Sequence, residues 1–492
     1  MSENGETGED RLIEARRHKH EHALAAGGYP HRFERTHLAA ELQERYADLG
    51  PEQETDDRVI VAGRLMLHRS FGKLQFGTLQ DVSGTIQLFV DERIAGAAAD
   101  EFAGYDLGDW VGAAGVIMTT KRGELSVKVD ELTMLQKALR PLPDKWHGLV
   151  DVEQRSRRRY VDLMVNEGAR RVAMTRAKII SELRTQFESR GFIEVETPVM
   201  LSQATGALAR PFVTHHNALD LDLQLRIATE LYLKRLVVGG LEKVFEIGRI
   251  FRNEGIDSTH NPEFTMLEAY QALADYADIM ALVEEVFVGV VEAAAGTLHP
   301  SYRERELSFE SPFRRVSLVE LVSGFVAEEV SLDTSSQRLA SFLSARGATF
   351  PEGAGTGKLL FELYELAHRE IWDPTFVTDF PTEVSPLSRK RDDEPRLTER
   401  FELVIAGAEY CNAFSELNDA DDQLARFEAQ AAARTAGDEA AHVIDYDYVE
   451  ALEYGLPPTG GLGIGVDRLV MLLTDQPHIR EVILFPTLRP ES

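Results

Sequence analysis

The pattern that most limits the fold lies between residues 57 and 135, where short alternating runs of apolar and polar residues are separated by glycine turns. Such alternation predicts β-strands with one buried face. Five runs in so short a segment predict a small closed barrel of the OB type, a fold that often binds single-stranded nucleic acid. A purely structural barrel without a ligand fits the pattern equally well. The runs are RVIVAGRLMLHRS, KLQFGTLQDVSG, TIQLFVD, WVGAAGVIMTT and ELSVKVDELTML.

The segments on either side of this barrel have a different character. Residues 1–55 are charged and helical in pattern, which predicts an N-terminal helical extension. The stretch RPLPDKWHGLVDVEQRSRRRYVDL combines two prolines with a run of arginines, and it predicts a linker that carries either a phosphate-facing patch or a solvated hinge. The predicted divisions are a helical extension over 1–55, an OB-fold domain over 56–138, a linker or hinge over 139–168 and a large domain over 169–492.

The large domain mixes helices and strands without a strict βαβ alternation. A helical pattern over 169–190 is followed by strand-like segments such as KVFEIGRIFRN and FTMLEAYQAL. This order predicts an α+β domain with an antiparallel β-sheet flanked by helices.

Composition restricts the possible functions only loosely. The formal net charge of −29 disfavours broad binding to nucleic acid, although it allows a local basic face. A single cysteine, Cys411, excludes an intrachain disulfide framework and a four-cysteine zinc site. No apolar run approaches the roughly 20 residues that cross a bilayer, and the polar start MSENGETGED lacks the features of a secretory signal. We therefore expect a cytoplasmic protein with no membrane partner.

The stretch FRNEGIDSTHNPEFTMLEAY at 251–270 places arginine, glutamate, histidine and aromatic residues close together. A solvated helix face can have this composition by chance. A site that binds a phosphate, a flat ring and a cation would need it. The stretch GGLGIGVDR at 460–468 adds glycines that let a backbone approach a ligand, and Arg468 suits phosphate oxygens at a helix start.

A third stretch, FELVIAGAEYCNAFSELND at 401–419, contains two strand-like runs around Ala406 and Gly407, which predict a hairpin. With a two-residue turn, Val404 lies opposite Glu409, and Glu402 projects from the same face as Glu409. Two carboxylates on one face suit a magnesium ion that bridges phosphates. Exposed strand carboxylates without a ligand are the alternative.

Three further polar or aromatic residues of this hairpin, Asn412, Phe414 and Glu416, have the opposite parity along the strand. A regular ladder would therefore point them away from the two carboxylates. They join the same pocket only if the strand contains a β-bulge.

Together and in this order, these segments resemble the three signature motifs of class II aminoacyl-tRNA synthetases, and most closely those of the lysyl-tRNA synthetase family in subclass IIb. Motif 1 corresponds to GFIEVETPVM, motif 2 to FRNEG…HNPEFTMLEAY and motif 3 to GLGIGVDRLVM; the stretches RPFVTHHNALDLDLQLRIATELYLKRLVVGG, PTEVSPLSR and FSELND are also similar to that family. The resemblance covers nearly the whole chain. It implies a class II catalytic domain, an anticodon-binding barrel and a homodimer assembled through motif 1.

The resemblance also implies a reaction. L-lysine is activated by ATP to lysyl-adenylate and then transferred to the 3′ end of tRNA(Lys), with Mg²⁺ as cofactor. The residues implied as catalytic are Arg252 and Arg468; those implied for ATP are Arg252, Glu254, His260, Asn261, Phe264, Glu402 and Arg468. Those implied for lysine are Gly206, Glu230, Glu268, Tyr270, Asn412, Phe414 and Glu416; for the metal, Glu402 and Glu409; and for an anticodon uridine, Arg64, Phe76 and Gln87 with Glu124 nearby.

The number of carboxylates favours lysine within this resemblance. A side chain and an amino group that are both cationic need acidic partners, whereas an aspartate or asparagine ligase of the same subclass would not need so many. A catalytically reduced RNA-binding paralogue is a second alternative, and intact motifs 2 and 3 disfavour it. A paralogue that lysylates a protein is a third alternative, disfavoured by the barrel. The sequence departs from the family at Thr205, Ala207, Thr229, Cys411 and Ala413, but each charged ligand is retained.

Overall fold

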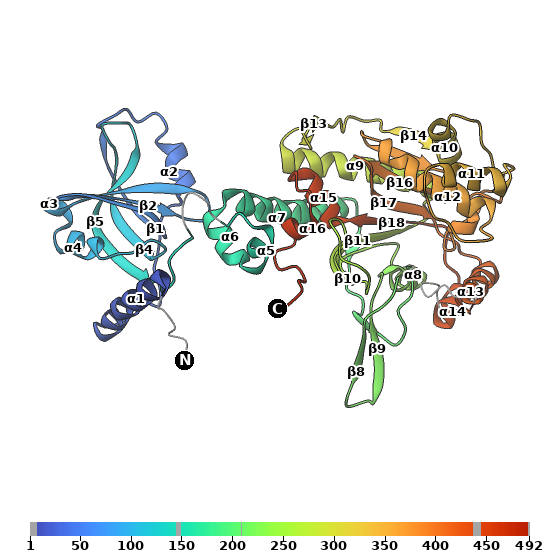
Figure 1. Cartoon of the computed structure of the whole chain (residues 1–492), viewed down its shortest axis with the longest axis horizontal. Helices are drawn as coiled ribbons and strands as arrows, with labels where there is room; N and C mark the ends of the chain where they lie inside the picture. Colours follow the sequence, from blue (N-terminus) through green and yellow to red (C-terminus); the bar gives the residue numbers. More distant parts are fainter. Residues whose placement is uncertain (1–6, 144–148, 208, 436–443, 491–492) are drawn as a thin grey trace. The chain divides into compact units, whose positions relative to one another are not determined.

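The computed structural model describes residues 7–143, 149–207, 209–435 and 444–490. The chain divides into two compact units, Met1–Val150 and Asp151–Ser492 (Figure 1). The finer division into four segments stays a prediction.

The first unit contains a closed five-stranded β-barrel, which confirms the fold predicted from the alternating runs. The spatial order of the strands is β1-β2-β3-β5-β4, and only β3 and β5 pair in parallel. Alternate side chains along each strand face the barrel interior, where Leu65, Leu88 and Val127 are completely buried. The strands are β1 Glu54–Phe71, β2 Leu74–Gln80, β3 Thr85–Asp91, β4 Trp110–Thr119 and β5 Leu125–Gln136.

Helices cover parts of this barrel. Phe102, from the connection between β3 and β4, is fully buried in the barrel core. Arg16 fastens the N-terminal helix α1, because its guanidinium donates to the carbonyl oxygens of Ala138 at 3.1 Å and Arg140 at 2.9 Å. The helices are α1 Gly8–Ala25, α2 Ala39–Arg45, α3 Glu92–Ala95 and α4 Ala97–Ala103.

The second unit is built around an eight-stranded sheet in the order β14-β15-β16-β17-β18-β11-β10-β6. The six central strands pair antiparallel, as predicted, while the edge strands β14 and β6 run parallel to their neighbours. The strands are β6 Ile193–Glu194, β10 Lys243–Phe251, β11 Glu263–Ala272, β14 Arg314–Ser317, β15 Thr375–Thr378, β16 Arg400–Ile405, β17 Ala408–Ser415 and β18 Thr459–Gly465.

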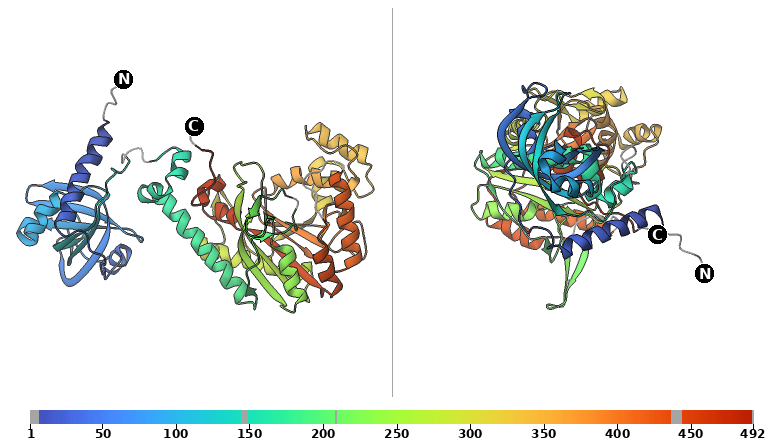
Figure 2. Two further views of the ribbon diagram at one scale, coloured as in Figure 1. Left: turned by 90° about the horizontal axis from the view of Figure 1, so that it is seen from below. Right: turned by 90° about the vertical axis from the view of Figure 1, so that its left-hand side faces the viewer.

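Helices flank this sheet and supply most of its core. The predicted helix over 169–190 is α7 Glu167–Glu188, which packs with α9 Tyr276–Ala295 and α15 Val466–Leu473 in one large apolar cluster (Figure 2). A second cluster joins α10 Leu318–Val326, α11 Ser336–Ala345 and α12 Thr356–Ala367 to the other end of the sheet. The remaining helices are α5 Val152–Arg157, α6 Arg159–Val165, α8 Glu230–Val238, α13 Ala420–Thr435, α14 Tyr446–Glu453 and α16 Ile479–Val482, with 3-10 turns at His368–Glu370 and Thr382–Val384.

Short strands outside the main sheet form two small sheets. The strands β7 Met200–Leu201, β8 Val213–His216 and β9 Leu221–Leu225 form a three-stranded sheet, and β12 Ser301–Tyr302 pairs with β13 Arg305–Glu306. The β8–β9 hairpin projects from the rest of the second unit in the views of Figures 1 and 2. Among the described residues, no helix is long and apolar enough to cross a membrane.

The arginine run at 155–159 is partly internal. Arg155 pairs with Asp162 at 3.0 Å and with Glu481 at 3.1 Å, and Arg159 pairs with Asp162 at 2.7 Å. Arg159 and Asp162 are buried. These two arginines therefore hold α5 and α6 in the second unit instead of facing a phosphate or forming a solvated hinge.

The glycine-rich stretch before α15 is the central strand β18. Crowding requires glycine at position 461 of this strand, since a Cβ there would lie 2.0 Å from an oxygen of Glu416 and 2.5 Å from the Tyr270 ring. No side chain fits between β18 and these neighbours. Glycine keeps the strand in the sheet while leaving room for the polar groups beside it.

Candidate active site

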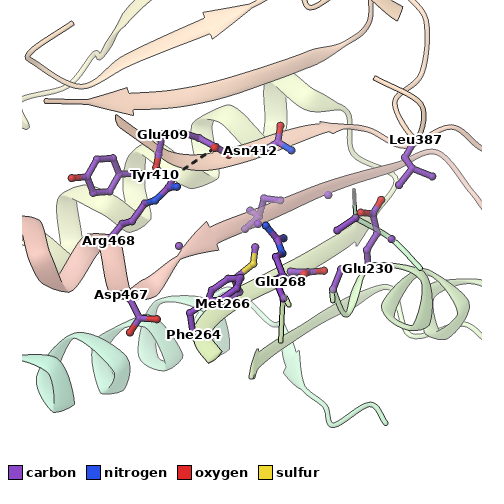
Figure 3. A pocket seen from close by; sticks show the side chains of 18 of the residues that line it. Glu230, Phe264, Met266, Glu268, Leu387, Glu409, Tyr410, Asn412, Asp467 and Arg468 are labelled. Carbon is purple, nitrogen blue, oxygen red and sulfur yellow. Dashed lines mark hydrogen bonds and ion pairs between the residues drawn. The ribbon is translucent and has the colours of Figure 1, made fainter. Parts of the chain in front are cut away.

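One cavity of about 430 Å³ opens over the central strands of the second unit. Figure 3 shows Glu409, Tyr410 and Arg468 on one side of it and Glu230 and Leu387 on the other. Most of the predicted substrate residues line it: Gly206, Glu230, Arg252, Glu254, His260, Asn261, Phe264, Glu268, Tyr270, Glu409, Asn412, Phe414 and Arg468. The two exceptions, Glu402 and Glu416, do not line the cavity and are almost fully buried.

The hairpin of β10 and β11 supplies a cation beside an aromatic ring. The ladder pairs Ile250 with Phe264, and the backbone N–H of Arg252 donates to the carbonyl of Pro262 at 2.9 Å. The Arg252 guanidinium carbon lies 5.1 Å from the centre of the Phe264 ring. Its Nε is buried without a hydrogen-bond partner among the described residues, and burial lowers the pKa of Arg252. A guanidinium that lines the cavity with its Nε unpaired is suited to an anionic oxygen.

The loop between these strands is braced by Asp257. Its carboxylate accepts the backbone N–H groups of Thr259 at 2.7 Å and His260 at 2.8 Å, and the imidazole of His260 also contacts it. These contacts hold the pKa of Asp257 far below its usual range, although burial opposes them. Asn261 is buried, donates to the carbonyl of Glu263 at 2.7 Å and has an Oδ1 without a partner among the described residues. The loop therefore presents a preformed polar edge.

Motif 3 joins this hairpin through residues that the sequence analysis did not select. Asp467 accepts the backbone N–H of Thr265 at 2.6 Å and pairs with Arg176 of α7. Arg176 also donates to the Thr265 hydroxyl at 3.0 Å. The next residue, Arg468, donates to the carbonyl of Glu409 at 2.7 Å, and its guanidinium is 3.6 Å from the Glu409 carboxylate.

The hairpin of β16 and β17 has the predicted turn. Val404 pairs with Glu409 across it, and Ala406 and Gly407 both have positive φ, 48° and 74°, as a tight two-residue hairpin requires. The register then shifts, since Leu403 pairs with Cys411.

That shift is the bulge on which the prediction for Asn412 and Phe414 depended. Tyr410 is the extra residue, so that Glu402 pairs with Asn412 and Arg400 with Phe414. The parity of the strand reverses at this point. Asn412 and Phe414 consequently line the cavity.

Glu402 is held by two neighbours. The Tyr364 hydroxyl donates to one carboxylate oxygen, and Arg400 donates to the other at 2.6 Å and to Asn412 at 2.9 Å. Burial, followed by the charge of Glu409, raises the pKa of Glu402 to about 7. No group of three or more potential metal ligands occurs in the described part of the chain.

The other end of the cavity is acidic. Glu230 and Glu268 are buried in its lining, and burial together with the charge of Glu230 raises the pKa of Glu268 to about 7. The backbone N–H of Thr229 donates to Glu268 at 3.2 Å. Glu416 lies behind Gly461 and forms an ion pair with Lys234 of α8. A cation close to these carboxylates would be strongly attracted.

In the first unit, the predicted anticodon residues lie on the outer face of the barrel. Phe76 and Gln87 alternate with buried neighbours, and the Phe76 ring is 5.6 Å from that of Phe89. Gln87 donates to the Ser126 hydroxyl at 2.9 Å, and this hydroxyl donates to the Glu124 carbonyl at 3.1 Å.

Arg64 lies on the neighbouring strand β1. Its guanidinium carbon is 5.2 Å from the centre of the Trp110 ring, and it donates to the carbonyl of Gly108 at 2.7 Å. Burial lowers the pKa of Arg64. The arginine is thus positioned by a ring and a carbonyl, with no carboxylate among these contacts.

Several residues around the cavity were missed by sequence reasoning. Two had a readable signal: Lys234 is four residues after Glu230 on a helix, and Asp467 directly precedes Arg468. Arg400 and Tyr364 had none, because only the folded sheet brings them to Glu402.

Comparison with known proteins agrees with this architecture. Residues 151–489 match the family of class II tRNA synthetases (D, K and N), and residues 59–135 match the OB-fold nucleic acid binding domain family. The lysine–tRNA ligase of Synechococcus sp. (strain CC9605) is 52% identical over 478 residues, which cover 95% of each chain. That of Thermosynechococcus vestitus is 50% identical over 505 residues, covering 100% of this chain and 99% of its own. The chain is therefore a class II tRNA synthetase with an OB-fold domain, and it belongs to the lysine–tRNA ligase family.

Proposed function

We propose that the chain activates L-lysine with ATP and transfers the lysyl group to the 3′ end of tRNA(Lys). The observation that carries this proposal is the division of one cavity into a cationic, aromatic end at Arg252 and Phe264 and an acidic end at Glu230 and Glu268. ATP brings a polyanion and a flat ring, and lysine brings two ammonium groups. The cavity has complementary groups for both substrates.

In the first step, a carboxylate oxygen of lysine attacks the α-phosphate of ATP, and pyrophosphate leaves. The carboxylate is already a nucleophile, so the step needs positioning and charge stabilisation more than a general base. Arg252 lines the cavity and its Nε has no partner among the described residues, and it would neutralise the charge that builds on the α-phosphate. A ribose hydroxyl of the tRNA terminus then attacks the adenylate carbonyl and releases AMP.

ATP would be held by residues from motifs 2 and 3. Phe264 would stack on adenine beside Glu254, His260 and Asn261, and Arg468 would bind the γ-phosphate. The Asp257 contacts that brace the loop support this assignment, because a preformed loop loses little entropy on binding.

Magnesium would be bound by Glu402 and Glu409. Their fit is supported by the raised pKa of Glu402, which reflects burial and the charge of Glu409 and which a bound cation would reverse. One or two carboxylates plus substrate phosphates are a common magnesium site, and the ion would neutralise phosphate charge there. Tyr364 and Arg400 orient Glu402 for this role.

Lysine would lie along the acidic end of the cavity. Glu230 would bind the α-ammonium, and Glu268, Tyr270 and Glu416 would bind the ε-ammonium. The other predicted lysine-binding residues, Gly206, Asn412 and Phe414, line the same cavity and support the same assignment.

The barrel would bind the anticodon of tRNA(Lys). Phe76 would stack on a uridine, with Arg64 and Gln87 at its polar edges and Glu124 nearby. A partly exposed ring with hydrogen-bonding groups around it suits an unstacked base.

A homodimer through motif 1 is part of the same proposal. Motif 1 exposes three apolar side chains, Ile193, Val199 and Met200, at 51%, 40% and 56% of their full area. Neighbouring exposed apolar residues of this kind are typical of an interaction surface. We place this dimer in the cytoplasm.

Charging of tRNA tests the whole proposal. The full-length protein, incubated with ATP, magnesium and radiolabelled lysine, is expected to lysylate tRNA(Lys). A tRNA(Lys) transcript whose anticodon uridines are changed to cytidines is expected to be charged far less efficiently. Binding of tRNA(Lys) without any charging would instead support a catalytically reduced RNA-binding protein.

A further inference from the structure

Lys234 is an ammonium inside the proposed lysine site that belongs to the protein itself. Its side chain is completely buried, and its Nζ lies 2.5 Å from a Glu230 oxygen and forms an ion pair with Glu416. The same Nζ is 5.4 Å from the centre of the Phe414 ring and 5.8 Å from those of Tyr270 and Tyr448.

These partners overlap with the groups proposed to bind the substrate. Glu230 was assigned to the α-ammonium of lysine, and Glu416 and Tyr270 to the ε-ammonium. Glu416 reaches the cavity only past Gly461, where a Cβ would lie 2.0 Å from its carboxylate oxygen. Glu230 thus lines the cavity, whereas its partner Lys234 does not line it and is completely buried.

The charges near the cavity show what this ammonium does. At the acidic end, Glu230, Glu268 and Glu416 supply three carboxylates and Lys234 supplies one ammonium, so the fully ionised groups leave two negative charges. The two ammonium groups of L-lysine match these two charges. Without Lys234, the buried carboxylates of Glu230 and Glu416 would lose their cationic partner, which is costly.

We propose that Lys234 is a specificity-determining residue that pairs with Glu230 and Glu416 before lysine binds, and so sets how many carboxylate charges are left for the two ammonium groups of lysine. This inference rests on the proposed lysine site. Lys234 does not contact the reacting atoms, so its effect is on lysine recognition and not on the chemical step.

The titratable groups that face Lys234 come from four elements: Glu230 on α8, Glu268 and Tyr270 on β11, Glu416 after β17 and Tyr448 on α14. Burial raises the pKa of Glu416, and Lys234 opposes that rise. Removing the ammonium removes this opposition, so that Glu416 would hold a proton more tightly in the empty site. The ε-ammonium of lysine would then have to displace this proton.

The test uses lysine-dependent ATP–pyrophosphate exchange by the full-length enzyme at saturating ATP. The quantity measured is the KM for lysine as a function of pH. We expect Lys234→Met to make the KM for lysine fall more steeply with rising pH than in the wild type, by a further factor of up to about ten per pH unit for the one proton that lysine displaces. The kcat is expected to change little. Arg235→Met is the matched control, because Arg235 is the next residue on α8 but pairs with Asp445 at 2.9 Å, outside this cluster.

A second variant separates recognition from folding. Lys234→Met/Glu416→Gln removes one carboxylate together with the ammonium, so it keeps the net formal charge of the site and leaves only Glu230 without its cationic partner, and its slope is expected to return to that of the wild type. It should also lose discrimination between lysine and norleucine, in which a methyl group replaces the ε-ammonium.

The possible results distinguish a failure of this inference from a failure of the proposed function. If Lys234→Met keeps the wild-type slope, or if the double variant keeps both the wild-type KM and the rejection of norleucine, the role given to Lys234 is wrong. If the wild-type protein itself shows no lysine-dependent exchange, the proposed function fails first.

Discussion

The carboxylate of Asp467 accepts the backbone N–H of Thr265 at 2.6 Å, and both residues are buried. Thr265 directly follows Phe264, and Asp467 directly precedes Arg468. One hydrogen bond thus joins the two segments proposed to hold opposite ends of ATP. Arg176 completes the arrangement by pairing with Asp467 and donating to Thr265.

Asp467→Asn tests this arrangement. The amide can still accept one hydrogen bond but leaves the buried Arg176 without its anionic partner, so we expect a loss of about 2–4 kcal/mol in the free energy of unfolding. Urea unfolding measures that loss. We also expect the KM for ATP to rise about tenfold while the KM for lysine stays within about twofold, since the lysine end does not depend on this bond. Equal increases in both values would contradict the arrangement.

Arg252→Ala separates activation from tRNA binding. Removing the cation that stabilises charge at the α-phosphate is expected to lower adenylate formation by a factor of at least about 10² to 10³. Binding of tRNA(Lys), measured by filter retention, should change little, because the proposed anticodon contacts lie in the other unit. Loss of tRNA binding with adenylate formation preserved would refute this division of roles.

The raised pKa of Glu268 leads to a prediction of how the KM for lysine depends on pH. Its pKa is raised to about 7 by burial and by Glu230, so the carboxyl is largely protonated below pH 7 in the empty site. Lysine requires the ionised form, and its KM should therefore fall as pH rises toward 7 and level off above it. The variant Glu268→Gln should bind lysine more weakly and lose this contribution to the slope. An unchanged slope would show that another group controls binding.

The raised pKa of Glu268 also affects the free energy of unfolding. Rising pH is expected to favour lysine binding but to lower this contribution to stability. The folded protein holds this proton more tightly than the unfolded chain, whose glutamate titrates near 4.5. The contribution of Glu268 to the free energy of unfolding should consequently decrease as pH rises from about 4.5 to 7. Urea unfolding of the wild type and Glu268→Gln across this range isolates the contribution, and an equal pH dependence in both would exclude it.

Phe76→Ala tests the barrel surface. Stacking of a base on an aromatic ring contributes about 1–3 kcal/mol, so we expect the KM for tRNA(Lys) to rise roughly ten- to hundredfold. Lysine-dependent pyrophosphate exchange needs no tRNA in this account and should be unchanged. A variant that loses exchange as well would indicate a folding defect, whereas an unchanged KM for tRNA would show that Phe76 does not contact the anticodon.

Much of this architecture could be predicted because it depends on local patterns. Alternation along the strands predicted the barrel, and the two-residue turn at Ala406 and Gly407 predicted the pairing of Val404 with Glu409. The bulge at Tyr410 could be stated only as a condition, because no local residue pattern required it. The structure was needed to show that Asn412 joins the cavity.

Contacts between distant segments could not be predicted from such patterns. Arg400 and Tyr364 reach Glu402 only through the assembled sheet and α12. Arg176 and Asp467 form an ion pair although they lie near opposite ends of the second unit in the sequence. The four-residue spacing of Glu230 and Lys234 is compatible with proximity on a helix, but Lys234 was not selected, because nothing in the spacing indicates that both residues are buried beside Glu416.

The central claim is that the acidic end of the cavity selects lysine for activation by ATP. The most direct measurement is ATP–pyrophosphate exchange by the full-length protein with lysine, aspartate, asparagine or norleucine as the only amino acid. The account predicts exchange that depends on lysine, with little or none for the other three. Exchange with aspartate or asparagine but not with lysine would contradict it.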